Sequence, residues 1–151
     1  MIYKERLKQL REEKELKQHE LANFLGFHVN GYGQFERETT LLPIKHLNTL
    51  SNFFEVSLDY LFNFTNIRQY KNINSKINSE LSGKRLKEFR RDNNLTQEKL
   101  AKFLNTTHTN LVGYEKGSYI IATPYLYMIC KKYNISADYL LGKIDEPKYL
   151  K

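Results

Sequence analysis

The sequence predicts an all-α protein built from two similar domains, and two observations lead to this prediction. First, apolar residues recur at helical spacing in short segments that begin at capping residues and end at turn residues, as between Leu95 and Gly117. Second, the chain repeats itself: a shift of 79 residues places Arg85 on Arg6, and the register continues without a gap. A repeat of this length, with apolar residues for a core in each copy, predicts two sequential domains rather than a stacked solenoid.

The stretch from Leu95 to Gly117 has the spacing of two short helices joined by a tight turn. Thr96 suits the cap of a first helix, which ends near Asn105, a residue that tolerates a left-handed backbone. Thr107 suits the cap of a second helix, in which Leu111 and Tyr114 point inward. The outward residues of that helix are small and polar: His108, Thr109, Asn110 and Gly113. Such side chains suit the base edges of a DNA major groove, although an ordinary surface helix would also carry them.

The net charge of +7 and the pI near 9.4 predict an acidic partner, and nucleic acid is a common one. The positive excess is uneven along the chain. Residues 1–62 carry 8 Lys or Arg against 9 Asp or Glu, residues 63–80 carry 3 against 1, and residues 81–151 carry 13 against 7. The second copy is therefore the half with the stronger attraction for a polyanion.

Composition and motifs exclude several other classes of protein. The chain is 40% hydrophobic and 27% charged, which is typical of a soluble globular protein. It has neither the ~18-residue apolar run of a membrane helix nor a signal peptide, so we expect a cytoplasmic protein with no membrane partner. The single cysteine, Cys130, lies among apolar residues and is expected to be a buried thiol.

No catalytic, metal or cofactor site is expected either. The four histidines do not stand at ligand spacing with one another or with a Cys or acidic cluster, which argues against a metal site. A phosphate-binding Gly-rich loop, a nucleophile elbow and a paired-carboxylate site are all missing from the sequence. We therefore expect a protein that is not an enzyme and that uses no cofactor.

The order of these residues resembles a known family. T-Q-x-x-L-A at Thr96, followed by a turn, a hydroxyl-capped helix and Y-E-x-G, resembles the helix-turn-helix of the lambda-repressor/Cro family, also called XRE-type. The resemblance covers roughly residues 3–62 and 83–142 and implies two tandem five-helix lambda-repressor-like DNA-binding domains. We place the domains at residues 1–62 and 81–142, with the segment 63–80 between them and a surface tail at 143–151.

The resemblance also implies which residues contact DNA. In this family the Gln that opens the second helix anchors to a phosphate, the first residues of the third helix read bases, and a basic residue after the Glu contacts the backbone. In the second domain these positions are Gln97, Thr107, His108, Thr109, Asn110 and Lys116. In the first domain they are Gln18, His28, Val29, Asn30, Gln34 and Arg37. His28 departs from the usual Ser or Thr cap, and Glu38 replaces the usual Gly.

Three further features each have two interpretations. A basic cluster in the second copy either contacts the DNA backbone or is a solvated face: Lys84, Arg85, Lys87, Arg90 and Arg91. The segment 63–80 is either a polar linker or an amphipathic helix whose stripe is Ile67, Tyr70, Ile73, Ile77 and Leu81. Several aromatic residues either stack on single-stranded bases or, as we expect, face the core: Phe24, Phe35, Phe54, Phe103, Tyr114 and Tyr139.

The resemblance implies a sequence-specific regulator of transcription that binds double-stranded DNA, with repression as the expected output. If both domains bind, two recognition helices would occupy half-sites about 34 Å apart, and the site would be asymmetric because the two reading surfaces differ. In the alternative, an antitoxin-like or regulatory protein, the first domain binds a protein partner or forms a homodimer, and only the second contacts DNA.

Overall fold

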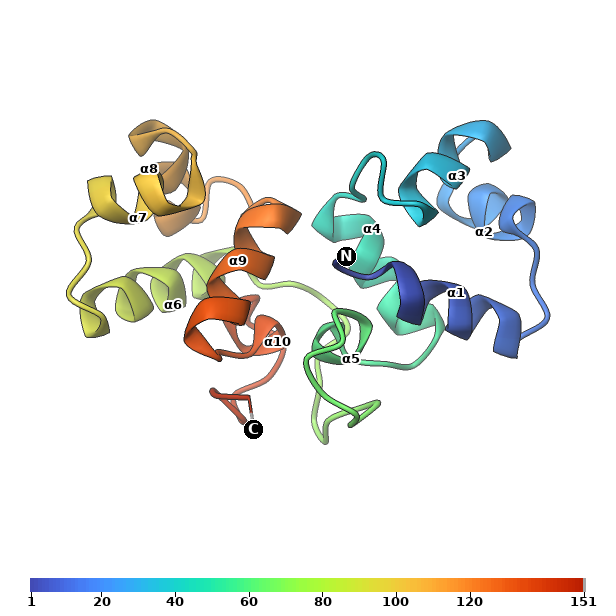
Figure 1. Cartoon of the computed structure of the whole chain (residues 1–151). Coiled ribbons are helices and arrows are strands. Elements are labelled where there is room, and N and C mark those ends of the chain that lie inside the picture. Colours follow the sequence, from blue (N-terminus) through green and yellow to red (C-terminus); the bar gives the residue numbers. More distant parts are fainter. Residues whose placement is uncertain (151) are drawn as a thin grey trace. The chain divides into compact units, whose positions relative to one another are not determined.

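The computed structural model describes residues 1–150, which form two compact units that divide between Lys71 and Asn72. Within these residues there are ten α-helices and no β-strand, and each unit contains five helices (Figure 1). The prediction of an all-α protein with two five-helix domains is therefore confirmed.

The first unit has its core where the helical spacing of the sequence predicts it. Its apolar core includes one residue from each helix, and each of these side chains is at most 1% exposed: Leu7, Leu21, Tyr32, Leu47 and Leu61. Burying one such side chain contributes about 1.5–3 kcal/mol. The helices are α1 (Lys4–Glu13), α2 (Gln18–Leu25), α3 (Val29–Glu36), α4 (Ile44–Phe53) and α5 (Leu58–Leu61).

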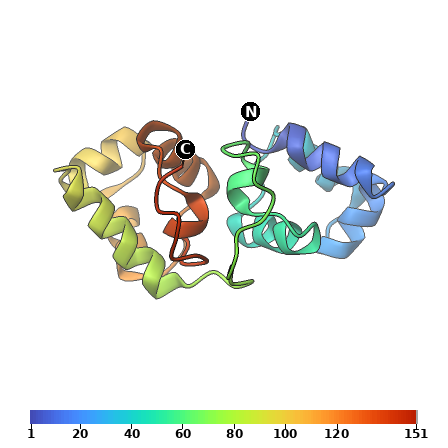
Figure 2. The same cartoon turned by 90° about the horizontal axis from the view of Figure 1, so that it is seen from below.

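The second unit repeats this core at the same register. A shift of 79 residues carries the five core residues of the first unit onto five buried leucines: Leu86, Leu100, Leu111, Leu126 and Leu140. Its first helix is the longest, with 14 residues, and runs along one side of the unit in the view of Figure 2. The helices are α6 (Ser79–Asp92), α7 (Gln97–Leu104), α8 (His108–Lys116), α9 (Thr123–Tyr133) and α10 (Ala137–Leu140).

The segment between the copies is not the amphipathic helix that one interpretation of its stripe predicted. No helix lies between Phe62 and Ser79. Asn63 and Asn72 both have a left-handed backbone, with φ of 62° and 58°, which stops a right-handed helix at each point. The part of the segment before Asn72 instead packs onto the first unit, because Ser57 donates its backbone N–H to the carbonyl of Arg68 and Tyr70 donates its hydroxyl to Asp59 at 2.8 Å.

The segment 143–151, expected to be surface chain, is in its described part buried at Lys143, Ile144 and Leu150, while Asp145, Glu146 and Tyr149 are exposed. Ile144 is 3% exposed and Leu150 is 8% exposed. Lys143 is fully buried with its ammonium 3.9 Å from the equally buried Asp138 carboxylate. Ser136 donates its backbone N–H to the carbonyl of Lys148. Each unit thus includes a segment that follows its fifth helix and folds back onto the cap of that helix.

One aromatic residue predicted to face the core lies on the surface. Phe24 is 50% exposed, and its ring lies 4.8 Å from that of Phe53, which is 36% exposed. The prediction is confirmed for Phe54, Tyr114 and Tyr139, which are buried. Cys130 is also fully buried, as its apolar neighbours predicted.

Candidate nucleic acid interface

The helix pair α7–α8 is held by local interactions that its sequence specifies. Thr96 caps α7 by accepting the N–H of Lys99 at 3.1 Å, and Thr107 caps α8 by accepting the N–H of Asn110 at 3.0 Å. Asn105 ends α7 with a left-handed backbone, φ 58°. Leu100, Leu104 and Leu111 are at most 1% exposed, and their burial fixes the angle between the helices.

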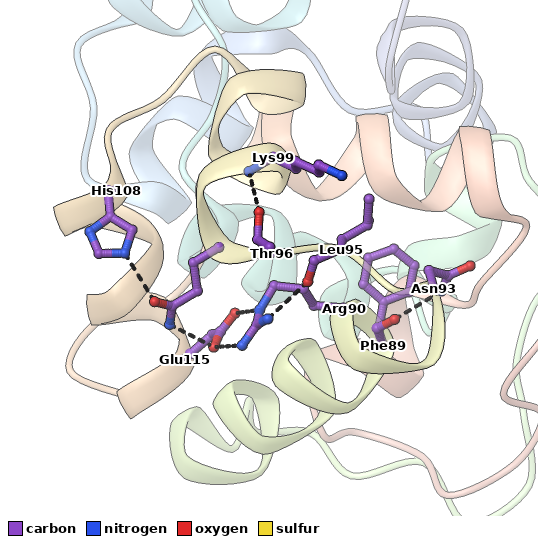
Figure 3. A network of polar contacts seen from close by, with 9 residues as sticks. Phe89, Arg90, Asn93, Leu95, Thr96, Lys99, His108 and Glu115 are labelled. Atoms are coloured by element: carbon purple, nitrogen blue, oxygen red, sulfur yellow. Dashed lines mark hydrogen bonds and ion pairs between the residues drawn. The ribbon is translucent and has the colours of Figure 1, made fainter.

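A polar network joins this pair to α6 (Figure 3). Arg90 donates to both carboxylate oxygens of Glu115, at 2.6 and 3.1 Å, and also to the carbonyl of Leu95 at 2.9 Å. Gln97 donates its amide to Glu115 at 3.1 Å, and its carbonyl oxygen lies 3.0 Å from Nε2 of His108. The network therefore links the first helix of the unit to the first residue of α7 and the first residue of α8.

The first unit contains the same network at the same register. Arg11 donates to Glu36 at 2.8 and 3.1 Å and to the carbonyl of Leu16 at 2.7 Å. Gln18 donates its amide to Glu36 at 3.3 Å. Val29 stands where the second unit has His108, so here the network ends at the Gln.

The two carboxylates of these networks are structural. The side chains of Glu36 and Glu115 are each 4% exposed, and each makes an ion pair with an Arg that is only slightly more exposed. A buried charge of this kind is tolerated because it is paired and hydrogen-bonded. In the first unit, the Glu36 carboxylate also holds the pKa of Arg11 above its ordinary value against the opposing effect of burial.

The expected contact residues of the second unit divide into exposed and occupied groups. His108, Thr109 and Lys116 are exposed on α8. The hydroxyl of Thr107 is occupied as the helix cap, and half-buried Asn110 donates its side-chain amide to Thr106 at 3.1 Å. Gln97 opens α7 and is half-buried, with both ends of its amide engaged in the network.

Gly113, predicted to point outward, is buried. The ring of Tyr119 lies directly over its Cα, so that a methyl group there would overlap the ring. Tyr119 is itself 48% exposed and packs edge-on against Tyr114. Sequence reasoning missed Tyr119 as a neighbour of the recognition helix, because it follows α8 in an irregular segment with no periodicity.

The expected contact residues of the first unit are more open. His28, Asn30, Gln34 and Arg37 are exposed, Val29 is 45% exposed, and Gln18 is half-buried at the start of α2. His28 stands at the cap position of α3 without a side-chain cap hydrogen bond, which agrees with its departure from the family's Ser or Thr.

Glu38, which stands where the family usually has Gly, is the second departure from the family pattern, and the structure explains it. Its backbone is left-handed, with φ of 60°, as expected where the family has Gly. Its carboxylate accepts the backbone N–H groups of Ile2, Tyr3 and Lys4 at 2.6–3.0 Å. Glu38, whose left-handed backbone is strained, therefore caps the start of α1.

The basic cluster on α6 also divides into exposed side chains and side chains that are held by other residues of the second unit. Arg90 is held by Glu115, and Arg85 donates to the carbonyls of Tyr139 and Ile144 and makes an ion pair with Asp145 at 2.8 Å. Lys84, Lys87 and Arg91 are exposed. Only these three are available to a polyanion, and Lys84 lies 3.3 Å from Glu80.

Among residues 1–150, no three His, Cys, Asp or Glu side chains come together as metal ligands. None of the helices described has the length and apolar character needed to cross a membrane.

Comparisons with known proteins agree with this geometry. A family model described as "Helix-turn-helix" matches residues 7–61, and a second described as "Helix-turn-helix domain" matches residues 83–146. Three similar proteins come from Bacillus subtilis (strain 168). HTH-type transcriptional regulator ImmR is 42% identical over 66 residues, which are 44% of this chain and 52% of ImmR.

The other two relatives show similar coverage. Uncharacterized HTH-type transcriptional regulator YobD is 34% identical over 64 residues, 42% of this chain and 57% of YobD. SPbeta prophage-derived uncharacterized HTH-type transcriptional regulator YonR is 39% identical over 64 residues, 42% of this chain and 59% of YonR. The chain thus matches between half and three fifths of each relative's length. The chain carries two tandem helix-turn-helix domains of the lambda-repressor/Cro-like, XRE type.

Proposed function

We propose that the protein is a sequence-specific regulator of transcription that binds double-stranded DNA and acts as a repressor. The observation that carries the proposal is the repeated Arg–Glu–Gln network, which fixes a helix pair in each unit. It leaves the start of α8 exposed and polar, and the start of α3 exposed. The names of the matched relatives, which describe regulators of the helix-turn-helix type, support the same function.

In this proposal the start of α8 enters the major groove. His108 and Thr109 face base edges, with Asn110 and Thr107 at the edge of the reading surface. The amide of Gln97 at the start of α7 and the ammonium of Lys116 lie against phosphates, where they set the register without reading sequence. The protein uses no catalysis in this role.

The start of α3 reads a different sequence. Asn30 and Gln34 supply hydrogen-bonding groups, and Val29 is suited to the methyl group of a thymine. Gln18 and Arg37 take the phosphate positions, and His28 lies beside them at the cap of α3. Because Val29 and Asn30 stand where the second unit has His108 and Thr109, the two units prefer different bases, and a site that engages both is asymmetric.

The first unit also supports a second candidate role, as a binding surface for a protein partner or for a second copy of the chain. The exposed Phe24–Phe53 pair favours this role. The corresponding residues of the second unit are Phe103 and Lys132, and there the Lys ammonium lies 4.5 Å from the centre of the Phe ring. The first unit thus exposes an apolar pair at the place where the second exposes a charge.

A matched pair of variants in the full chain separates these roles. The chain is first used to select duplexes from a random pool, and the binding of Thr109→Ala and Asn30→Ala is then measured on the selected duplex at two salt concentrations. If both units read DNA, each variant relaxes base preference at its own position, by about 1–3 kcal/mol. An effect of Thr109→Ala alone assigns DNA reading to the second unit, and selection of no duplex at all would reject the proposed function.

Two further variants test the phosphate contacts. Lys116→Ala removes a backbone contact and is expected to weaken binding to all duplexes about equally, with a shallower dependence on salt. Lys131→Ala, an exposed lysine on α9 outside the proposed surface, is the control. Equal losses from the two variants would reject the placement of Lys116.

A further inference from the structure

In the polar network of the second unit, the donor and acceptor roles of the end groups determine where each hydrogen lies. The guanidinium of Arg90 can only donate, and the ionised carboxylate of Glu115 can only accept. The amide of Gln97 must therefore turn its NH2 group toward Glu115, at 3.1 Å. Its carbonyl oxygen then points at Nε2 of His108, at 3.0 Å (Figure 3).

This orientation determines the tautomer of His108. The Gln97 oxygen is an acceptor, so Nε2 of His108 has to carry the hydrogen that joins them. In the neutral ring the other nitrogen, Nδ1, then carries a lone pair. His108 is the exposed first residue of α8, and the described residues offer Nδ1 no hydrogen-bond partner. An oriented acceptor thus stands at the start of the proposed recognition helix.

We propose, resting on the function proposed above, that His108 reads an exocyclic amino group, of adenine or cytosine, through Nδ1 when neutral, and becomes a donor that favours guanine when protonated. The major-groove edge of adenine or cytosine presents an N–H donor, whereas guanine presents the acceptors N7 and O6. In the protonated ring both nitrogens donate, so base preference depends on the protonation state of His108 and hence on pH.

The charged groups joined to the ring are Glu115 and Arg90. They reach His108 through the neutral amide of Gln97, and they form an ion pair with each other, so their charges offset. The first unit has no counterpart to the switch, because Val29 occupies this position, although Gln18 is held by Glu36 in the same way. Only the second unit therefore has a histidine on its recognition helix that this network orients.

The first experiment uses the full chain without DNA. Nitrogen-15 NMR of the imidazole rings at pH 8 should show His108 as the Nε2–H tautomer alone, while exposed His19 shows a mixture. Gln97→Ala should return His108 to the mixture. Val29→His, which places an imidazole beside Gln18, should create a second ring with the fixed tautomer. A mixed tautomer of His108 in the unaltered chain would overturn the network argument.

The second experiment measures base preference at the position that His108 contacts. Duplexes that differ only in that base pair are titrated with the full chain at pH 8 and at pH 5.5. We expect adenine or cytosine to bind roughly fivefold more tightly than guanine at pH 8, and the order to reverse at pH 5.5. His108→Gln should remove the reversal, and His19→Gln should keep it. A preference that does not change with pH would overturn the reading role.

The two experiments separate failure of this inference from failure of the proposed function. If the chain bound no duplex, the proposed function and the reading role would both be rejected, while the NMR result would still decide the tautomer. If the chain bound DNA with a pH-independent preference, the proposed function would stand and only the inference would be rejected.

Discussion

The two domains share a framework but differ in where their first helices begin and in what contacts the start of those helices. In the second domain α6 begins at Ser79, one turn earlier than α1 does at the corresponding register, and its backbone passes close to the end of α8. A methyl group at Gly83 would lie 2.5 Å from the carbonyl oxygen of Glu115, and one at Gly117 would lie 3.0 Å from that of Ser79. Glycine makes this close approach possible.

In the first domain Lys4 and Glu38 occupy the positions of those two glycines. The extra turn is missing, and the Glu38 carboxylate fills its place by accepting three backbone N–H groups at the start of α1. The helix-turn-helix core therefore does not require one entry geometry. Asn78 caps α6 locally by accepting the backbone N–H of Leu81 at 3.0 Å, whereas α1 is capped by Glu38, which lies 34–36 positions away from the residues that it caps.

The largest expected effect comes from the feature that the domains share. Glu115→Ala leaves Arg90 buried without its partner, and Glu36→Ala does the same to Arg11. Removing one member of a buried pair costs about 3–5 kcal/mol. We expect each variant to lower the free energy of unfolding of its own domain by this amount, measured by urea titration of the full chain with NMR signals assigned to each domain. A loss below about 1 kcal/mol in either domain would mean that the networks are not equivalent.

The next effect tests the close approach in the second domain. Gly83→Ala places a methyl group against backbone that cannot move aside easily, and overpacking of this kind costs about 1–3 kcal/mol. Gly31→Ala, in α3, is the matched control because no atom lies within 4 Å of the added methyl. It should stabilise the first domain by about 0.5–1 kcal/mol, since Ala favours helix more than Gly does. The same urea titration checks both, and a neutral Gly83→Ala would show that α6 can shift.

A smaller effect tests the side-chain cap in the first domain. Glu38→Ala keeps a side chain at a left-handed position but removes the acceptor for the N–H groups of Ile2, Tyr3 and Lys4. Loss of a helix cap costs about 0.5–2 kcal/mol. Hydrogen exchange at the first turn of α1 should accelerate together with this loss of stability. Unchanged exchange there would mean that solvent replaces the carboxylate without cost.

The smallest effect is a pH dependence confined to the first domain. Burial lowers the pKa of His46, which packs against Phe27 at 4.7 Å, and the charge of Lys45 lowers it further. The folded state therefore favours the neutral ring, so this contribution to stability is present above the unfolded pKa, near 6.5, and is lost as the pH falls below it. Tyr125 stands at this position in the second domain. His46→Tyr should flatten the dependence of the first domain's unfolding midpoint between pH 7.5 and pH 5.5.

Much of the fold was predictable because the signals are local. The helical spacing of Leu100, Leu104 and Leu111 identified the core, and Thr96 and Thr107 cap the helices that they were expected to cap. The exposed surface of α8 was predicted in part. His108 and Thr109 are exposed, whereas Gly113 is covered by Tyr119. An amphipathic stripe predicts which side of a helix faces inward, but not which loop residue returns to cover the other side.

Two errors, in residues 63–80 and in the tail, share one cause. The apolar stripe of residues 63–80 has helical spacing, yet the left-handed backbone at Asn63 and at Asn72 prevents a continuous helix. The tail after Lys143 has too few apolar residues to show a period, yet Ile144 and Leu150 are buried. In both cases the chain folds back on a preceding helix, and contacts of this kind leave no regular spacing in the sequence.

The sequence by itself determined the number of domains, the helices and their cores, because a repeat, a period of 3.6 and a cap depend on residues close together in the chain. Only the tertiary structure decided how the first helix of the first domain is capped and which hydrogen-bonding groups the recognition helices present. Glu38 reaches Ile2 across 36 positions, and Arg90 reaches Glu115 across 25. The orientation of the Gln97 amide, and with it the expected tautomer of His108, follows from such distant partners, which become neighbours only when the helices pack.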